Sequence, residues 1–377
     1  MPENEKQLNK GTFLYVGNFE LPDKGASANR VMSNRLLFAE LGYRTAFLGI
    51  TRGESFAGVR QSSCDADIWE RSYPKSTRQW LQHSYSVQDL ITAAAKYPDL
   101  KAVILYNCPY GLTRNAYKYF SKKGVKVLYD CTEWNPDTEG NPLKKLYKKY
   151  DAKCIQYKLE KYVDGLIPVS TTMYKQYTKK PKLLLPPLVD TEAPLWQQSG
   201  CREDGVYEFC YAGEPGKKDD LCKLIEAYQN VAAENVRLKI IGLSQAEFTA
   251  DHPEYAEKLS GVIFTGRLSH EEVIQSLLLT DCFIFIRESN PRTNAGFPTK
   301  FVEAYTSGAQ VITANISDIR SYEEDGITVL DHPALSDISS AMAAALQQNR
   351  TGQIRTRFDF RGFWSEAEAF IKEIKLV

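Results

Sequence analysis

Short apolar segments alternate with longer amphipathic segments along most of this chain. Short apolar runs are typical of buried parallel strands, whereas apolar residues spaced three and four apart indicate helices. Residues 51–80 show no clear period and are rich in Ser and Arg, so we expect mostly loop there. In the rest of the first half the pattern predicts strands at 13–16, 45–50, 102–106, 125–129 and 165–169, and helices at 28–41, 87–97, 111–122 and 143–162.

The second half repeats this alternation. It predicts strands at 207–211, 236–241, 262–265, 282–286 and 310–313, and helices at 221–232, 271–279, 297–307 and 362–374. Such alternation favours parallel sheets covered by helices. Prolines at 186 and 187 and a polar stretch at 197–205 indicate a linker. We therefore expect an α/β protein of two doubly wound domains, residues 1–188 and 189–360. A C-terminal helix at about 361–377 can pack back on the first domain.

The segment from Arg287 to Ala314 is the best candidate for a binding loop. It reads strand, loop, helix and strand, with Pro298 suited to the first helical turn and Gly308 to the position after the helix. A helix that begins beside such a loop presents free backbone N–H groups, which favour an anion. The donors would be the amides of Thr299 and Lys300. Most loops of this kind bind nothing, so the pattern alone leaves the question open.

Composition narrows the class of protein. The hydrophobic and charged fractions, 43% and 25%, are those of a soluble globular chain. We find no run long enough to span a bilayer and no signal-peptide core. Eight scattered cysteines and four histidines suggest reduced thiols and no metal site. We read the triplet Asp65-Ala66-Asp67 as solvated surface. We expect a cytoplasmic location, no cofactor and no nucleic-acid partner.

Charge is distributed unevenly along the chain. Residues 1–190 hold 29 Lys and Arg against 19 Asp and Glu, while residues 191–377 hold 18 against 28. The predicted helix at 143–162 combines many lysines with Leu and Tyr. Such a helix can lie on an anionic membrane surface, placing the protein on the inner face of the membrane. An ordinary surface helix, whose Leu and Tyr pack on the sheet, explains the same pattern.

The sequence AGFPTKFVEAYTSGAQVI resembles the nucleotide-sugar loop of family-4 retaining glycosyltransferases of bacterial polysaccharide-biosynthesis type. These have the GT-B fold, two doubly wound Rossmann-like domains that face a cleft. Their loop carries two glutamates separated by seven residues; Glu303 matches the second, and Ala295 stands in place of the first. The segments Gly25–Arg30, Tyr211–Asp220 and Gly266–Leu268 are similar to other loops of that family, and 106–109 and 130–134 follow strands at the edge where such sheets bind ligands.

The resemblance implies transfer of a sugar from a UDP- or GDP-linked donor to a glycan or lipid-linked acceptor, without a metal. A lysine of the first donor loop would reach the diphosphate, with Lys218 preferred over Lys217. Glu303 would bind the ribose. The residues assigned catalytic roles are Asp130, Glu133 and Lys218. Those assigned to the donor are Gly25, Ala26, Gly213, Lys217, Arg267, Arg287, Gly296, Phe297, Thr299, Lys300 and Glu303.

Two departures from the family pattern keep other functions open. Glu214 stands where an arginine is frequent, and Ala295 removes a carboxylate that usually contacts the donor sugar. Both would suit a non-catalytic GT-B protein that binds a partner or a sugar. A nucleotide-sugar epimerase of the same fold is the second alternative. Arg287 or Arg292 could replace the missing positive charge.

Overall fold

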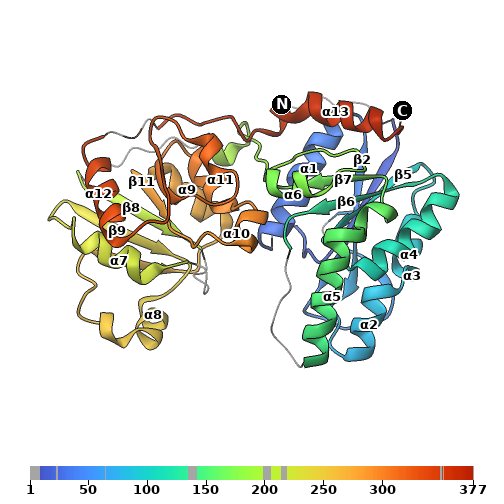
Figure 1. Cartoon of the computed structure of the whole chain (residues 1–377), viewed down its shortest axis with the longest axis horizontal. Helices are drawn as coiled ribbons and strands as arrows, with labels where there is room; N and C mark the ends of the chain where they lie inside the picture. The colour runs from blue at the N-terminus through green and yellow to red at the C-terminus, as the bar shows by residue number, and fades with distance from the viewer. Residues whose placement is uncertain are drawn as a thin grey trace. The chain divides into compact units, whose positions relative to one another are not determined.

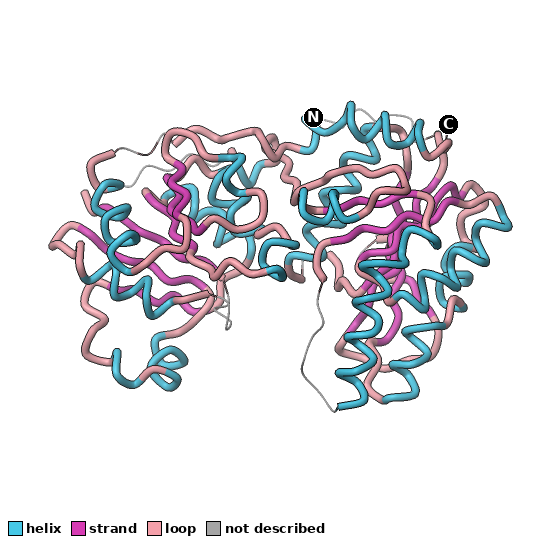
Figure 2. The backbone as a smooth tube through the Cα atoms, viewed as in Figure 1, coloured by secondary structure: helices cyan, strands magenta, loops and turns pink. Residues whose placement is uncertain are grey.

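The computed structural model describes residues 9–22, 24–63, 65–134, 142–197, 205–213, 219–348, 350 and 352–376. The chain divides into two compact units. Unit 1 comprises residues 1–188 and 360–377, and unit 2 comprises residues 189–359. Each unit contains one sheet flanked by helices (Figures 1 and 2).

Unit 1 contains a seven-stranded sheet in the order β3-β4-β2-β1-β5-β6-β7. The strand pairs are parallel except β3 with β4. The strands are β1 (Thr12–Gly17), β2 (Arg44–Thr51), β3 (Val59–Gln61), β4 (Ile68–Ser72), β5 (Leu100–Tyr106), β6 (Lys126–Cys131) and β7 (Gly165–Pro168). The helices are α1 (Ala26–Glu40), α2 (Thr77–Tyr85), α3 (Gln88–Ala94), α4 (Tyr110–Phe120), α5 (Pro142–Lys158), α6 (Thr171–Gln176) and α13 (Trp364–Glu373).

Unit 2 contains a six-stranded parallel sheet in the order β10-β9-β8-β11-β12-β13. The strands are β8 (Tyr207–Ala212), β9 (Val236–Ile241), β10 (Val262–Gly266), β11 (Cys282–Phe285), β12 (Gln310–Ala314) and β13 (Ile327–Leu330). The helices are α7 (Leu221–Gln229), α8 (Gln245–Asp251), α9 (His270–Leu279), α10 (Pro291–Ala295), α11 (Thr299–Thr306) and α12 (Leu335–Ala345).

The predicted strands outside residues 51–80 all form, because each contains an apolar run that the sheet buries. Most of the described residues at 51–80 are loop, as predicted, but the prediction missed the short elements there. That stretch supplies β3, β4 and the start of α2, and β4 pairs with β2. The apolar signal is weak there because Ile68 is the only apolar residue of β4 that is fully buried, while Arg71 is buried in place of an aliphatic side chain. The pattern also missed α6, α8, α10, α12 and β13.

The C-terminal helix α13 packs on unit 1 rather than on unit 2. Its Phe370 and Ile371 join the buried cluster that contains Val31 of α1, and Figure 1 shows the two helices side by side. A Cβ at Gly165 would lie 2.7 Å from the Phe370 ring, so the glycine permits this close approach. None of the described helices is long and apolar enough to cross a membrane.

Candidate functional site

The strand order of unit 2 reverses between β8 and β11. The chain builds β9 and β10 on one side of β8, and then β11, β12 and β13 on the other. In open α/β sheets, ligands bind beyond the carboxyl ends of the strands at such a switch point. Gly213 follows β8 there, and Arg287 lies two residues beyond β11. Asp219 and Arg287 are joined by a backbone bridge, which ties the two loops together.

A single carboxylate organises the charges at this switch point. Asp219 Oδ2 lies 2.8 Å from Lys300 Nζ, and Asp219 Oδ1 lies 2.7 Å from Arg287 Nη2. The Tyr211 hydroxyl donates to Asp219 Oδ2 at 2.7 Å and accepts from Lys300 Nζ at 2.9 Å. The Phe285 ring lies under the Arg287 guanidinium, 4.7 Å away. Three elements, β8, β11 and α11, therefore converge on one polar cluster.

The cluster carries more positive than negative charge. Burial of Asp219 acts to raise its pKa, but the neighbouring Lys300 and Arg287 charges lower it below its usual value, so the group stays ionised. Burial lowers the pKa of Lys300, and Asp219 opposes that shift. Asp219 is 2% exposed, whereas Lys300 and Arg287 are 20% and 19% exposed. Two partly exposed cations thus share one buried anion, which favours a further anion beside them.

Gly213 is required where Lys300 crosses the loop. Its φ is +140°, a value that residues with a side chain rarely adopt. A Cβ there would lie 2.1 Å from Lys300 Cε and 2.2 Å from Nζ. The glycine therefore gives the lysine its path to Asp219.

The helix α11 begins as the sequence predicts, at the loop that holds this cluster. Pro298 is its N-cap, and the Phe301 amide donates to the Pro298 carbonyl at 3.1 Å. Thr299 and Lys300 come before Phe301 in the first turn of the helix. Amides in this position have no acceptor within the helix and can donate to another group. Gly308, with φ +75°, follows the helix as expected.

Two residues of the preceding loop have roles within the protein. Phe297 is half-buried against Tyr322 and Phe358, with ring centroids 5.7 and 5.8 Å away. The Gly296 carbonyl accepts a hydrogen bond from the Ser317 hydroxyl. The backbone φ of Gly296 is −81°, a value that any residue can adopt. The loop itself contains the helix α10, capped by the Asn290 side chain, which the sequence pattern did not predict.

Glu303 lies one turn along α11 from Thr299. Its Oε1 is 3.0 Å from Nε2 of His270, the first residue of α9, and its side chain is 19% exposed. Sequence reasoning missed His270, because 33 residues separate it from Glu303. The side chain of Arg267 is 67% exposed, and its guanidinium lies 3.5 Å from Glu247 of α8.

A cavity of about 500 Å³ opens beside the Asp219 cluster. Its lining comes from the carboxyl ends of β8, β11, β12 and β13. The lining residues that bear polar side chains are Asp219, Asp220, Lys223, Arg287, Glu288, Ser289, Asn315 and His332.

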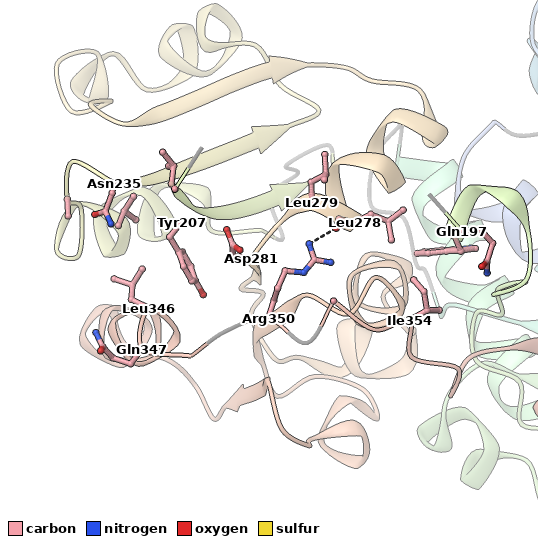
Figure 3. Close-up of a pocket in the computed structure, with 16 residues that line it drawn as sticks. Gln197, Tyr207, Asn235, Leu278, Leu279, Asp281, Leu346, Gln347, Arg350 and Ile354 are labelled. Carbon is pink, nitrogen blue, oxygen red and sulfur yellow. Dashed lines mark hydrogen bonds between the residues drawn. The ribbon is translucent and has the colours of Figure 1, made fainter. Parts of the chain in front are cut away.

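A larger cavity of about 890 Å³ lies at the opposite edge of the same sheet (Figure 3). Tyr207 and Val236, which open β8 and β9, line it. Its polar groups bond to the protein: Tyr207 donates to the Ala345 carbonyl at 3.0 Å, and Arg350 donates to the Leu278 carbonyl. Residues 201–204, 349 and 351 lie outside the described residues. Position and bonding both favour the carboxyl edge as the candidate site.

Asp130 of unit 1 is fully buried at the end of β6. Its carboxylate accepts from the Arg30 guanidinium at 2.7 Å and from the Tyr15 hydroxyl, and Arg30 also donates to the Leu185 carbonyl at 2.9 Å. Buried charges require such pairing. With no exposed surface, Asp130 does not reach a ligand in this conformation. The Asp130 carboxylate therefore links the end of β6 to β1 and α1.

The other predicted residues of unit 1 lie on the surface. Glu133 is exposed and lines a cavity of about 370 Å³. Gly25, with φ +90°, is the N-cap of α1, and Ala26 is the first residue of that helix. Glu214, Lys217 and Lys218 lie outside the described residues, so their predicted roles stay predictions. Among the described residues no three His, Cys, Asp or Glu side chains are grouped as a metal site would require.

Comparison with known proteins identifies the class of fold. Residues 195–360, just under half of the chain, match the family model described as glycosyl transferases group 1. Sucrose-phosphate synthase from Thermosynechococcus elongatus has a similar structure, with TM-score 0.71 and 12% identity over 97% of this chain and 99% of that one. No curated protein sequence matches the chain significantly.

Two further solved structures are similar over both units. The lipopolysaccharide outer core galactosyltransferase WaaB has a TM-score of 0.64 at 15% identity, over 96% of this chain and 99% of that one. Anabaena Alr3699/HepE, in complex with UDP, has a TM-score of 0.64 at 11% identity with the same coverage. The chain thus has the GT-B glycosyltransferase fold. The match of residues 195–360 to that family model supports an enzyme that transfers glycosyl groups.

Proposed function

We propose that this protein is a retaining, metal-independent glycosyltransferase of the family-4 type. It would move a hexose from a UDP- or GDP-linked donor to a hydroxyl of a glycan or lipid-linked acceptor in bacterial surface-polysaccharide or glycoconjugate assembly. The proposal rests on the sequence of the 295–312 segment and on the match of residues 195–360 to a glycosyltransferase model.

The observation that carries the proposal is the pair of partly exposed cations at the switch point of unit 2. Lys300 and Arg287 share Asp219 there, beside the N-terminus of α11. A nucleoside diphosphate supplies the anion that such a group lacks. Glu303, one turn along, can accept hydrogen bonds from ribose hydroxyls. That HepE is in complex with UDP agrees with this choice of ligand.

In the proposed reaction the acceptor hydroxyl attacks the anomeric carbon on the face that the leaving diphosphate vacates. The C–O bond to the diphosphate breaks, and a phosphate oxygen takes the acceptor proton, so no protein nucleophile is needed. Negative charge grows on the diphosphate as the bond breaks. Lys300, Arg287 and the predicted Lys218 would stabilise that charge, which is how fixed cations lower a barrier of this kind.

Incubation of the protein with UDP-, GDP- and dTDP-sugars tests the proposal and its rivals. Slow hydrolysis to the nucleoside diphosphate is expected of a transferase without acceptor. Interconversion of the sugar would instead identify an epimerase. Absence of any turnover, with binding of sugar alone, would identify a non-catalytic protein.

We also propose that the surface of α5 meets an anionic membrane from the cytoplasmic side. Leu146, Tyr150 and Tyr157 of this helix are 66%, 56% and 69% exposed, and their spacing of four and seven residues puts them on one face. Exposed lysines flank that face. The alternative of an ordinary surface helix predicts that the Leu and Tyr side chains pack inward. Tyr147 does so, against Trp80, whereas Leu146, Tyr150 and Tyr157 are exposed. Apolar groups bordered by lysines suit the boundary of an anionic lipid layer.

Co-sedimentation with liposomes tests this surface. We expect binding that needs anionic lipid and fades as salt rises, because each lysine contributes about 1 kcal/mol of electrostatic attraction. Changing Lys145 and Lys149 to Glu should abolish it. The same change at Lys122 and Lys123, which are exposed after α4, is the control. Equal recovery on neutral and anionic liposomes would contradict the proposal.

A further inference from the structure

The Lys300 ammonium meets two acceptors of the protein. Its Nζ donates to Asp219 Oδ2 at 2.8 Å and to the Tyr211 hydroxyl at 2.9 Å. A protonated lysine carries three N–H donors. We find no third acceptor for Nζ among the described residues, and the side chain is 20% exposed. One N–H of Lys300 therefore remains for a group outside the described part of the chain.

The Tyr211 hydroxyl is held in one direction by the same two residues. It donates its single proton to Asp219 Oδ2 at 2.7 Å, so toward Lys300 it acts only as an acceptor. Burial, and then the charge of Asp219, raise the pKa of Tyr211 well above its usual value, so the hydroxyl keeps this proton near pH 7. Tyr211, Asp219 and Lys300 thus form a closed ring of three hydrogen bonds, which strengthen one another.

Aromatic rings and a glycine determine where the end of the lysine lies. Nζ lies over the rings of Tyr211 and Phe285, 4.7 and 5.5 Å from their centroids. An ammonium is attracted to such rings. Gly213 leaves room beside it, since a Cβ there would lie 2.2 Å from Nζ. The position of Nζ is therefore fixed by packing, and its two hydrogen bonds fix the direction of its third N–H.

Arg287 offers a second donor beside Lys300. Its Nε donates to Asp219 Oδ1 at 2.7 Å, and its Nη2 lies 2.7 Å from the same oxygen. Its Nη1 has no acceptor in the part of the chain that the structure describes. Two neighbouring cations, each with an N–H left over, suit an anion whose oxygens lie on adjacent phosphorus atoms.

Tyr211 itself does not reach a ligand. It is 2% exposed, and its hydroxyl is occupied by Asp219 and Lys300. Without this hydroxyl, Asp219 would keep both of its cations, whereas Lys300 would lose one of the two bonds that orient its ammonium. The hydroxyl can therefore influence a bound anion chiefly through Lys300.

We propose that Tyr211 is a positioning residue, which directs the third N–H of Lys300 to a diphosphate. The description of that diphosphate as part of a sugar donor rests on the proposed function. The positioning does not, because it can be measured with a diphosphate that carries no sugar.

Calorimetry on the full-length protein tests this role, with UDP, GDP and inorganic pyrophosphate as probes. For the tightest-binding probe we expect Tyr211→Phe to lower affinity about fivefold and Lys300→Ala about tenfold or more. The double variant should bind no more weakly than Lys300→Ala alone, because the hydroxyl then has no ammonium to position. Thermal denaturation verifies that the variants fold.

Tyr228→Phe is the matched control. The Tyr228 hydroxyl is also buried in unit 2, where it donates to the Val236 carbonyl at 2.9 Å, so its loss should change stability and not affinity. A further variant tests position without altering Tyr211. Lys300→Arg keeps the positive charge but replaces the ammonium by a larger, planar group. We expect its affinity to stay near that of Lys300→Ala.

The cycle of variants separates positioning from a structural role. A hydroxyl that serves only the fold lowers stability when it is removed and leaves affinity unchanged. That result, an equal loss with and without Lys300, normal affinity in Lys300→Arg, or failure of every probe to bind would each overturn the proposal. Nucleotide-sugar hydrolysis is measured in parallel. Turnover without coupling between Tyr211 and Lys300 defeats the positioning alone, and coupling in pyrophosphate binding without turnover of any nucleotide sugar defeats the proposed function alone.

Discussion

The Lys300 ammonium occupies the space that a side chain at position 213 would take. A Cβ on Gly213 would lie 2.2 Å from Lys300 Nζ, closer than any van der Waals contact allows. The lysine in turn lies 2.8 Å from Asp219. One glycine therefore determines whether the α11 cation reaches the carboxylate at the switch point of unit 2.

Replacing Gly213 by alanine should displace Lys300 and weaken the binding of a nucleoside diphosphate at least tenfold. The left-handed backbone adds a cost of about 1–2 kcal/mol to folding. Calorimetry with UDP and GDP measures the affinity. In the double variant Gly213→Ala, Lys300→Ala, the clash is gone but the backbone cost stays, so stability should recover partly and affinity not at all. Normal affinity in the single variant would contradict this assignment.

Lys300→Ala should lower nucleotide affinity by about tenfold or more, since a hydrogen bond to a charged group contributes about 1.5–3 kcal/mol. Asp219 retains Arg287, 2.7 Å away, so the fold should survive. Lys258→Ala is the control, because that lysine lies over the Tyr255 ring, away from the cluster. Equal affinities in the Lys300 and Lys258 variants would remove Lys300 from the site.

Glu303→Gln should also weaken nucleotide binding at least tenfold, because the neutral amide accepts ribose hydroxyls less strongly than a carboxylate does. The contact between His270 and Glu303 allows the variants of the two residues to be compared, which the sequence alone did not suggest. If His270 only orients Glu303, His270→Ala should lower affinity less than Glu303→Gln. A larger loss in the His270 variant would make the histidine the direct ligand contact.

Lys218→Ala should lower turnover more than donor affinity, because the charge on the leaving diphosphate is largest in the transition state. Steady-state kinetics with a donor that the protein hydrolyses provides the test. A greater loss in Lys217→Ala would show that the neighbouring lysine fills the role.

Asp151 gives stability a pH dependence that can be isolated by substitution. Burial raises the pKa of Asp151 from 3.8 to about 6, although the hydrogen bond from the Tyr110 amide acts to lower it. The folded protein therefore holds a proton that the unfolded chain loses at lower pH, so this group destabilises the fold increasingly as pH rises from about 4 to 6. Asp151→Asn removes the effect and can keep the bond to Tyr110.

The advantage of Asp151→Asn over the original protein should grow across that interval and level off above it. A shift of about two pKa units corresponds to about 3 kcal/mol at most. Denaturant unfolding of both proteins at several pH values measures the difference, and effects common to both cancel. A constant difference from pH 4 to 7 would contradict the assignment.

The sequence predicted most strands and the loops that follow them, because apolar runs and glycines are local signals. Gly213 and Arg287 were placed beside strand ends, and Lys300 at the start of a helix, for this reason. Asp219, the common partner of Arg287 and Lys300, was not foreseen, since 81 residues separate it from Lys300. The pairing depends on the order of strands in the sheet, which local patterns do not specify.

The direction in which a side chain points was the second feature that the sequence did not determine. Asp130 ends a strand, as a ligand-binding carboxylate would, yet it turns inward to Arg30, 100 residues away in the chain. On α5 the positions of Tyr147 and Tyr150 are three residues apart and equally apolar. The packing of Trp80 and Tyr85 on Tyr147 makes that residue half-buried, whereas Tyr150 is exposed.

Donor turnover by the original protein and the Lys300→Ala variant is the most direct test of the account. Each is incubated with UDP-, GDP- and dTDP-sugars, and free nucleoside diphosphate is measured over time. We predict that one class of donor is hydrolysed slowly by the original protein and at least tenfold more slowly by the variant. Hydrolysis of no donor, or equal hydrolysis by both proteins, would contradict a nucleotide-sugar site at the switch point of unit 2.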